Sequence, residues 1–274
     1  MKKYLSLIKF SHTVFAMPFA LIGFFLATKS YSFEWVTLIY IILCMVFARS
    51  AAMGFNRYID RDIDKKNKRT ANIREIPSGT IKPNNALIFV IINSLLFIST
   101  TYLINILCFT LSPVALIIIL GYSYTKRFTA LCHFILGIGL ALSPIGAYLA
   151  VSSEFHITPI LFSLTMLFWV SGFDIIYSLQ DEEFDKSQNL HSIPVLIGKQ
   201  NSLHLSILLH AISIITLFVI GNISDFTIWY WIGLFIFSTL LIYQHTLIKV
   251  HGLSKINLAF FTTNGIASVI FSMF

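Results

Sequence analysis

The chain has 274 residues, of which 57% are hydrophobic and only 11% are charged, and its formal net charge is +7. Roughly a quarter of the residues in a soluble domain are charged, so this composition excludes an ordinary soluble globular protein. Apolar runs of about 17 to 22 residues recur along the chain, which is the length that crosses a hydrocarbon core of about 30 Å. We therefore expect an all-α integral membrane protein with a single domain over residues 1–274.

These runs predict a bundle of about nine transmembrane helices. The first run, which contains "FAMPFALIGFF", has no small-residue cleavage site and is long enough to stay in the membrane, so we do not expect a signal peptide. The predicted spans are centred on residues 10–28, 35–54, 85–105, 107–122, 131–151, 158–178, 202–221, 227–247 and 255–273.

Basic residues are distributed unevenly between the two sides of this predicted bundle. The N-terminus and the loops after the second, fourth, sixth and eighth spans share one side, and only Lys29, beside Glu34, falls on the other. Because loops rich in Lys and Arg stay in the cytoplasm, this distribution places the N-terminus there. The positive charge therefore reflects topology and not nucleic-acid binding, and we expect a multi-pass protein of the bacterial inner (cytoplasmic) membrane.

Histidines and cysteines give weaker signals. His12 and His191 lie near the cytoplasmic ends of spans one and six, where we expect structural hydrogen bonds, with a substrate contact as the alternative for His12. Buried, neutral and hydrogen-bonded side chains are expected for three histidines that fall in spans without a partner pattern: His204, His210 and His245. Buried thiols without disulfide or metal roles are expected at Cys44, Cys108 and Cys132.

Most of the acidic residues are concentrated in two segments. The first follows the second span and the other follows the sixth, so both face the same compartment and we expect them to converge. The first segment holds Asp60, Asp62, Asp64 and Glu75, and the second holds Asp174, Asp181, Glu182, Glu183 and Asp185. Charged loops that merely flank the membrane are the alternative interpretation for either segment taken alone.

The spacing within each segment is helical. Asn56, Asp60 and Asp64 are four residues apart, and Asp174, Asp181 and Asp185 are separated by seven and four, so each set falls on one stripe of a helix. Asp62, Glu182 and Glu183 lie off these stripes, and we expect them to be solvated or ion-paired. Stacked carboxylates repel one another unless a cation lies between them, and Mg²⁺ prefers carboxylate and phosphate oxygens. The two stripes thus predict metal ions on either side of a diphosphate.

Basic residues near the stripes fit a diphosphate site. Arg69, Arg74 and Lys126 are expected to bind phosphate oxygens, whereas Lys65 and Lys66 are ordinary membrane-flanking charges. The chain has no glycine-rich phosphate loop, so ATP chemistry is not indicated. A diphosphate handled at the mouth of an apolar bundle indicates a lipid-tailed substrate, such as an isoprenoid diphosphate.

The two acidic segments resemble the paired aspartate-rich motifs of the UbiA superfamily of intramembrane aromatic prenyltransferases. Asn56, Asp60 and Asp64 match the first motif, and Asp174, Asp181 and Asp185 match the second. The resemblance extends along the chain, through "IKFSHTVFAMPFALIG", "RSAAMGFNRYIDRDID", "YSYTKRFT", "LQDEEFDKSQNLHSIPVLIG" and "INLAFFTTNG". It is closest to the bacterial 4-hydroxybenzoate polyprenyltransferase-like subgroup.

This resemblance implies a reaction: Mg²⁺-assisted loss of diphosphate, attack of an electron-rich aromatic ring on the allylic cation, and loss of the ring proton. It also implies roles for individual residues. Arg49 would hold the carboxylate of the acceptor, with Asn56 and Asp174 beside it, and Tyr122 would join Lys126 near the diphosphate. The catalytic carboxylates would be Asp60, Asp64, Asp181 and Asp185, which with Asn56 would also be the metal ligands.

The chain departs from the family pattern at two positions. Arg57 stands where many relatives carry an Asp, so the first motif has one carboxylate fewer. Ile73, between Asn72 and Arg74, lies in a stretch that often lacks this residue, so the family pattern does not fix the position of Arg74.

We therefore expect transfer of a polyprenyl group from an allylic polyprenyl diphosphate to 4-hydroxybenzoate or a close analogue in quinone biosynthesis, at an active site facing the cytoplasm. The partners would be the diphosphate, the aromatic carboxylate and the bilayer, with no nucleic acid. The alternatives are a naphthoate or futalosine-route menaquinone precursor as acceptor, or a cation-coupled transporter. Transporters gather their charges near the bilayer midplane, whereas here they gather at the cytoplasmic ends of the spans.

Overall fold

The computed structural model describes residues 2–8 and 15–274, and these fold as helices with no strand among them. The all-α prediction is therefore confirmed. In chain order the α-helices are α1 (Lys2–Leu7), α2 (Met17–Ala27), α3 (Trp35–Ile59), α4 (Arg61–Lys66), α5 (Pro83–Ile104), α6 (Ile106–Thr125), α7 (Cys132–Ser152), α8 (Ile157–Ser178), α9 (Glu182–Ser187), α10 (Ile193–Ile223), α11 (Ile228–His251) and α12 (Asn264–Met273). A π-helical turn over Leu258–Thr263 precedes α12.

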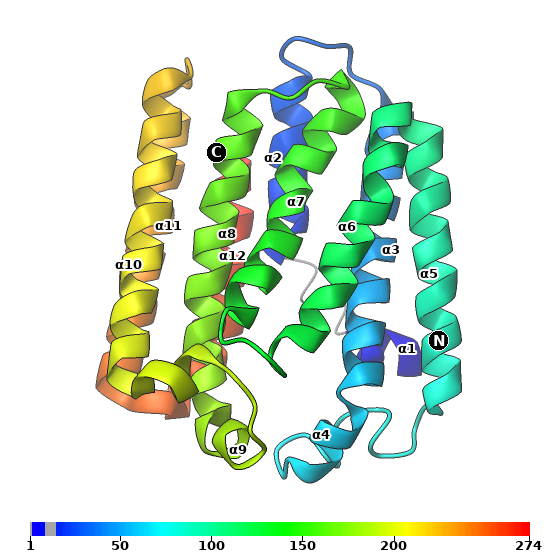
Figure 1. Cartoon of the computed structure of the whole chain (residues 1–274). Helices are drawn as coiled ribbons and strands as arrows, with labels where there is room; N and C mark the ends of the chain where they lie inside the picture. Colours follow the sequence, from blue (N-terminus) through cyan, green and yellow to red (C-terminus); the bar gives the residue numbers. More distant parts are fainter. Residues whose placement is uncertain (1, 9–14) are drawn as a thin grey trace.

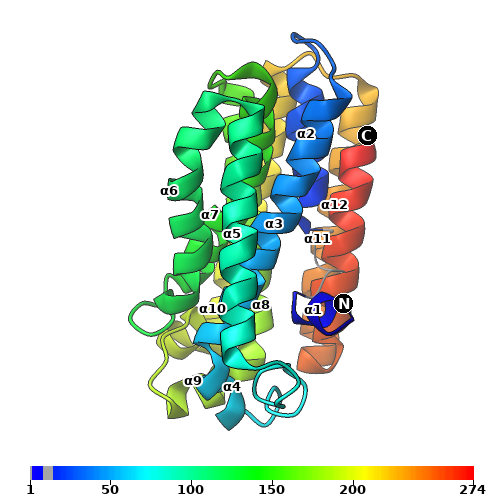
Figure 2. The same ribbon diagram turned by 90° about the vertical axis from the view of Figure 1, so that its right-hand side faces the viewer.

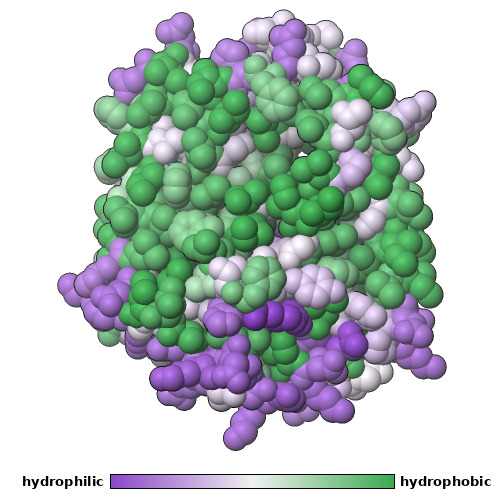
Figure 3. Space-filling model, in the orientation of Figure 1, coloured by the Kyte–Doolittle hydropathy of each residue, from purple (hydrophilic) through white to green (hydrophobic). Residues whose placement is uncertain are grey.

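The long helices stand side by side in one bundle, and the short helices α1, α4 and α9 lie at the same end of it (Figures 1 and 2). The most extensive helix contacts are those of α8 with α7 and α10, and of α3 with α5. On the face drawn in Figure 3, apolar side chains cover the middle of the molecule, and polar side chains lie at both ends, mostly at the end that carries α4 and α9. This is the surface expected of a membrane protein whose polar chemistry lies at one interface.

Seven of the described helices are long and apolar enough to cross a membrane, and they correspond to the second to eighth predicted spans. The first and ninth spans correspond to the shorter apolar helices Met17–Ala27 and Leu258–Met273, so the total of nine stays a prediction. Residues 9–14, which include Lys9, His12 and the start of the first predicted span, lie outside the described residues.

The seventh predicted span begins at residue 202, whereas α10 begins nine residues earlier at Ile193. The difference has a local cause at Gly198, whose φ of 75° and ψ of 166° interrupt the helix with a kink. A residue with a side chain would be strained at this φ, so glycine permits the kink. The short first part of α10 lies at the polar end, and the part after the kink is the predicted span.

One half of the bundle is filled by aromatic side chains from α2, α8, α11 and α12. Trp169 is fully buried, stacks on Phe19 with ring centroids 5.5 Å apart, and meets Phe237 at 5.6 Å. Its indole Nε1 donates a hydrogen bond of 3.2 Å to Oδ1 of Asn264, so its one polar atom is satisfied. This half is filled by interlocking side chains, whereas a cavity lies in the half formed by α3, α5, α6 and α7.

The three histidines of the later spans differ in their surroundings. His210 Nδ1 lies 2.8 Å from Nε2 of His245, so α10 and α11 supply the partner that the sequence pattern did not indicate. His210 is buried as expected, and both rings are hydrogen-bonded. The expected burial is wrong for His204, which is exposed and pairs with Gln200 at 3.1 Å, because it lies in the first turns after the Gly198 kink.

A close approach between α2 and α7 generates a test of this packing. A Cβ atom added to Gly23 would lie 2.0 Å from the backbone oxygen of Pro144, which cannot move aside as a side chain can. We expect Gly23→Ala to destabilise the protein by about 1–3 kcal/mol through overpacking. Thermal unfolding in detergent should show a lower midpoint for this variant. Gly146→Ala is the matched control, because a Cβ atom there meets nothing within 4 Å, and an equal loss in both variants would contradict the assignment.

Candidate active site

The first acidic segment keeps its helical register although α3 ends within it. Asp60 has a ψ of 4° and separates α3 from α4. The backbone N–H of Asp60 still donates to the carbonyl of Asn56 at 2.9 Å, and that of Asp64 donates to the carbonyl of Asp60 at 2.7 Å. Asn56, Asp60 and Asp64 therefore stay on one side, and the two carboxylates are only 2% and 3% exposed. Asp62 is turned to solvent, as expected from its position off the stripe.

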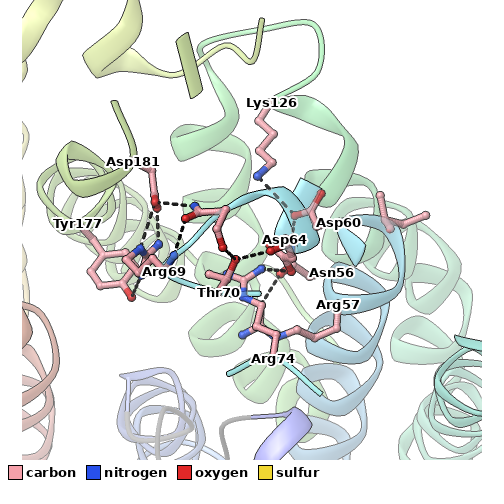
Figure 4. A network of polar contacts seen from close by, with 12 residues as sticks. Asn56, Arg57, Asp60, Asp64, Arg69, Thr70, Arg74, Lys126, Tyr177 and Asp181 are labelled. Carbon is pink, nitrogen blue, oxygen red and sulfur yellow. Dashed lines mark hydrogen bonds and ion pairs between the residues drawn. The ribbon is translucent and has the colours of Figure 1, made fainter. Parts of the chain in front are cut away.

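Cations from the turn after α6 and from the loop after α4 hold these two carboxylates (Figure 4). Arg127 Nη2 donates to Oδ1 of Asp60 at 3.0 Å, and Lys126 Nζ lies 3.6 Å from Oδ2 of the same residue. Arg74 forms an ion pair with Asp64. The neighbouring Ile73 is exposed, so the additional residue in this loop does not displace Arg74 from the site.

The second acidic segment meets the first through Asp181. Arg69 donates two guanidinium N–H groups to this carboxylate, one of them from Nε at 3.1 Å, and Asn67 Nδ2 donates a further bond of 3.0 Å. A third guanidinium nitrogen of Arg69 donates to the hydroxyl of Tyr177 at 3.2 Å. Burial by itself lowers the pKa of Arg69, but the hydrogen bond and charge of Asp181 outweigh it and raise that pKa above its ordinary value. The predicted convergence of the two segments is therefore confirmed.

Asp185 and Asp174 have other partners. Asp185, in α9, is buried and lies within electrostatic reach of Lys126, Asp181 and His133. Asp174, near the end of α8, is paired with His133 of α7, with 2.7 Å between Oδ2 and Nδ1. The three aspartates of the second motif thus meet three different sets of partners, because the helix changes to a 3₁₀ turn between Asp174 and Asp185.

A cavity of about 400 Å³ lies between α3, α5, α6 and α7. Its lining is mostly aliphatic and extends from Arg49 and Tyr122 to Ala150 and Phe155 near the other end of the bundle. Tyr122 lies within electrostatic reach of Arg49, Arg57 and Asp60, so this end of the cavity adjoins the first acidic segment. The cavity therefore joins a polar end to a long apolar space.

Two guanidinium groups at the polar end are incompletely satisfied. The Nε atoms of Arg49 and Arg57 are buried and have no hydrogen-bond partner in the part of the chain that the structure describes. Arg57 Nη1 donates to Oδ1 of Asn56 at 3.1 Å, whereas no such bond is found for Arg49. Buried polar groups in folded proteins are almost always paired, so an orphaned donor in a cavity wall marks a place for an acceptor group such as a carboxylate.

The sequence interpretation did not assign roles to Asn67, Tyr177 or His133, and it placed Arg127 only among the basic residues that fit a diphosphate site. Arg127 adjoins the predicted Lys126, and Asn67 adjoins the basic run before Arg69, so their neighbours gave a signal. Tyr177 and His133 lie within apolar spans, and only the packing of α7 against α8 and of the loop against α8 reveals their partners. The remaining predicted residues lie at the polar end of the bundle or on the cavity wall.

The acidic side chains at the polar end have the chemistry of a site for a hard divalent ion. Carboxylate oxygens, the ligands that Mg²⁺ prefers, are present at Asp60, Asp64, Asp181 and Asp185, and therefore fit a hard divalent ion. Among the described residues, however, no three His, Cys, Asp or Glu side chains gather in a way that would hold a metal ion by themselves. These carboxylates therefore suit a metal ion that binds one or two of them and completes its coordination shell with phosphate oxygens and water.

The fold and the site together define a helical membrane protein with paired charged segments at one end of an apolar cavity. Residues 16–266 match the model of the UbiA prenyltransferase family, and the chain belongs to that family. It is therefore a prenyltransferase, which favours the enzyme over the transporter alternative.

Individual relatives agree with this assignment. The chain is 33% identical over 247 residues to a 4-hydroxybenzoate octaprenyltransferase of Vesicomyosocius okutanii, with 90% of this chain and 89% of the relative covered. A UbiA homologue from Aeropyrum pernix K1, solved in its apo form, is similar with a TM-score of 0.87, 28% identity and 96% of each chain covered. A UbiA homologue from Archaeoglobus fulgidus, solved bound to DMAPP and Mg²⁺, shares the fold with a TM-score of 0.77 at 23% identity, covering 99% of this chain and 96% of the other.

The contact between Arg69 and Asp181 can be tested apart from activity. Arg69→Gln removes the charged donors that join the two segments, and we expect the loop over residues 67–82 to open about fivefold more often, since a partly exposed charged pair contributes about 1 kcal/mol. Hydrogen exchange of that loop measures the opening. Arg61→Gln is the control, because Arg61 lies 3.8 Å from an Asp62 side chain that is 80% exposed. Unchanged exchange in Arg69→Gln would show that other contacts hold the segments together.

Proposed function

We propose that the protein transfers a polyprenyl group from an allylic polyprenyl diphosphate to an aromatic acid, 4-hydroxybenzoate or a close analogue, in quinone biosynthesis. The observation that carries this proposal is the orphaned Arg49 guanidinium on the wall of an apolar cavity that adjoins the first acidic segment. An aromatic carboxylate would supply the missing acceptor, and its ring would remain in apolar surroundings. The name of the Vesicomyosocius okutanii relative supports the same acceptor.

The prenyl donor would bind with its tail in the cavity and its diphosphate between the acidic segments. Arg69, Arg74 and Lys126 would bind phosphate oxygens, since each already lies against one of the carboxylates there. We propose Asn56, Asp60, Asp64, Asp181 and Asp185 as the residues that hold Mg²⁺. When bound, Mg²⁺ would neutralise the negative charge that develops on the departing diphosphate.

The chain's own residues would then orient the two reactants. The bond between the prenyl C1 and the diphosphate oxygen breaks, and its electron pair leaves with the diphosphate. A ring carbon of the acceptor forms the new bond to C1 and gives up its proton to the released diphosphate. Arg49 would fix the acceptor by its carboxylate, and Asn56 and Asp174 would contact its polar groups, so that the ring faces C1. Tyr122, which lines the cavity with Arg49 and lies within electrostatic reach of Asp60, would lie where the two substrates meet.

Prenyl transfer can be measured in membranes with labelled 4-hydroxybenzoate and an allylic polyprenyl diphosphate, with Mg²⁺ or with a chelator. We expect a Mg²⁺-dependent product that falls at least about 100-fold in Asp64→Asn and Asp181→Asn, since each removes a charged ligand while keeping the shape. Asp62→Asn, in the same segment but exposed, should keep full activity. If the wild-type protein prenylates only a naphthoate, the acceptor assignment is wrong, and if it prenylates neither, the proposed reaction fails.

The role of Arg49 predicts a change confined to the acceptor. Arg49→Gln should raise the KM for 4-hydroxybenzoate about 10- to 100-fold, because a hydrogen bond to a charged group contributes about 1.5–3 kcal/mol. The KM for the polyprenyl diphosphate should stay within about twofold of the wild-type value. Steady-state kinetics with each substrate varied in turn measure both constants. Equal increases in the two would place Arg49 in general packing and not in acceptor binding.

The active site is proposed to face the cytoplasm of a bacterial cell, and a membrane-impermeant maleimide tests this. In a chain whose cysteines are replaced by serine, Thr80→Cys reports on the exposed loop beside α4, and Ser32→Cys on the exposed loop between α2 and α3. Intact spheroplasts should label the residue-32 variant and label the residue-80 variant only after lysis. The reverse pattern would contradict the cytoplasmic placement.

A further inference from the structure

His133 is a buried histidine that the proposed reaction does not yet use. It lies in the first turn of α7 and is only 3% exposed. Its Nδ1 lies 2.7 Å from Oδ2 of Asp174, on the neighbouring helix α8. Leu136 and Leu140, one and two turns further along α7, line the cavity, so His133 continues the same side of the helix toward the polar end.

A second hydrogen bond determines which ring nitrogen carries the proton. The backbone N–H of Ile193, at the start of α10, points to Nε2 of His133 at 3.3 Å. A backbone amide can only donate, so Nε2 must accept and cannot itself carry a proton. The proton of the neutral ring is then on Nδ1, which donates to the carboxylate of Asp174. The ring is held by both nitrogens, between α8 and α10.

The surroundings of Asp174 explain why its orientation matters. Asp174 is one helical turn from Tyr177. The hydroxyl of Tyr177 accepts a hydrogen bond from Arg69, which also binds Asp181. Asp174 therefore lies on the side of α8 that carries the second acidic motif. Its side chain is 21% exposed, in contrast to the 4% of His133, so the carboxylate is accessible from one side and fixed from the other. The hydrogen bond to Oδ2 leaves Oδ1 for a ligand.

We propose that His133 is a positioning residue, which orients the carboxylate of Asp174 toward the aromatic acceptor by donating a hydrogen bond from Nδ1. The proposal rests on the proposed function, in which Asp174 contacts the acceptor. A purely structural role is the competing explanation: the ring would then serve to anchor the start of α10 through Ile193. The two roles use different ring nitrogens, and two substitutions separate them.

Asparagine and glutamine each reproduce one of the two contacts. The amide of Asn is near the position of Nδ1, so His133→Asn keeps a donor to Asp174 and loses the acceptor for Ile193. The amide of Gln reaches the position of Nε2, so His133→Gln keeps the acceptor and loses the donor. We expect kcat/KM for the acceptor to fall about 10- to 100-fold in His133→Gln and less than about threefold in His133→Asn. The KM for the polyprenyl diphosphate should not change in either.

A double-mutant cycle with Asp174→Asn connects the two residues. Once the carboxylate of Asp174 is removed, His133→Gln should cause no further loss, because it acts only through that carboxylate. His204→Gln serves as the control histidine, since His204 is exposed and pairs only with Gln200 among the described residues, and it should keep full activity. The thermal unfolding midpoint of every variant is measured in detergent, so that loss of the fold is distinguished from loss of positioning.

The outcomes distinguish the hypotheses. Activity retained in His133→Asn and lost in His133→Gln supports positioning, whereas the reverse order, or equal losses in two folded variants, overturns it. If His133→Gln does not fold, the kcat of a folded His133→Asn variant decides. A kcat close to the wild-type value supports the proposal, and a large loss of kcat overturns it. A wild-type protein that prenylates no aromatic acid overturns the proposed function and this inference with it, while an active wild-type protein with unaffected His133 variants overturns only the inference.

Discussion

The contact of Asp181 with Arg69 and Asn67 is the interaction on which the polar end of this molecule depends. It joins the loop after α4 to the turn after α8, two segments more than 100 residues apart in the chain. The helices beside them, α4 and α9, have six residues each and are too short to be stable alone. The contact restrains the loop after α4 against the turn after α8. With it, the two segments form the two walls of one site.

Most charged side chains at this end are paired with a side chain of opposite charge, but two arginines keep an unpaired guanidinium N–H group. Asp60, Asp64 and Asp181 are each matched by Lys or Arg, which offsets the large cost of removing carboxylates from water. Arg49 and Arg57 retain donors that no described residue satisfies. An unsatisfied buried donor weakens the folded state, and Arg49, unlike Arg57, lies in the wall of the apolar cavity, where the proposed acceptor carboxylate would satisfy it. In a prenyltransferase, an anionic group of a substrate can accept hydrogen bonds from such donors while a hydrocarbon tail lies in the apolar cavity.

The bundle divides its volume between stability and binding. The half around Trp169 is filled with interlocking aromatic rings, where removal of any large side chain would leave a cavity. The half around α3, α5, α6 and α7 is lined partly by small residues, including Ala48, Ala52 and Gly139, and stays open. Because lipid tails are as apolar as the helices, the hydrophobic effect alone does not close such a space. The filled half can thus hold α7 and α8 in place, while the open half has space for the prenyl chain that we propose as its ligand.

Much of this organisation was determined by the sequence itself. Apolar run length predicts which segments are helices in a membrane, and the four-residue spacing of Asn56, Asp60 and Asp64 predicts their common face, because both depend only on local geometry. The same holds for the exposure of Asp62.

The tertiary structure alone decided which cation meets which carboxylate, since Arg69 could have reached any nearby aspartate until the loop was folded against α8. It also decided the pairing of His133 with Asp174 and of His210 with His245, which lie 41 and 35 residues apart and carry no periodic signal. Contacts between helices depend on how the helices pack and rotate, and a pattern within one helix does not contain that information.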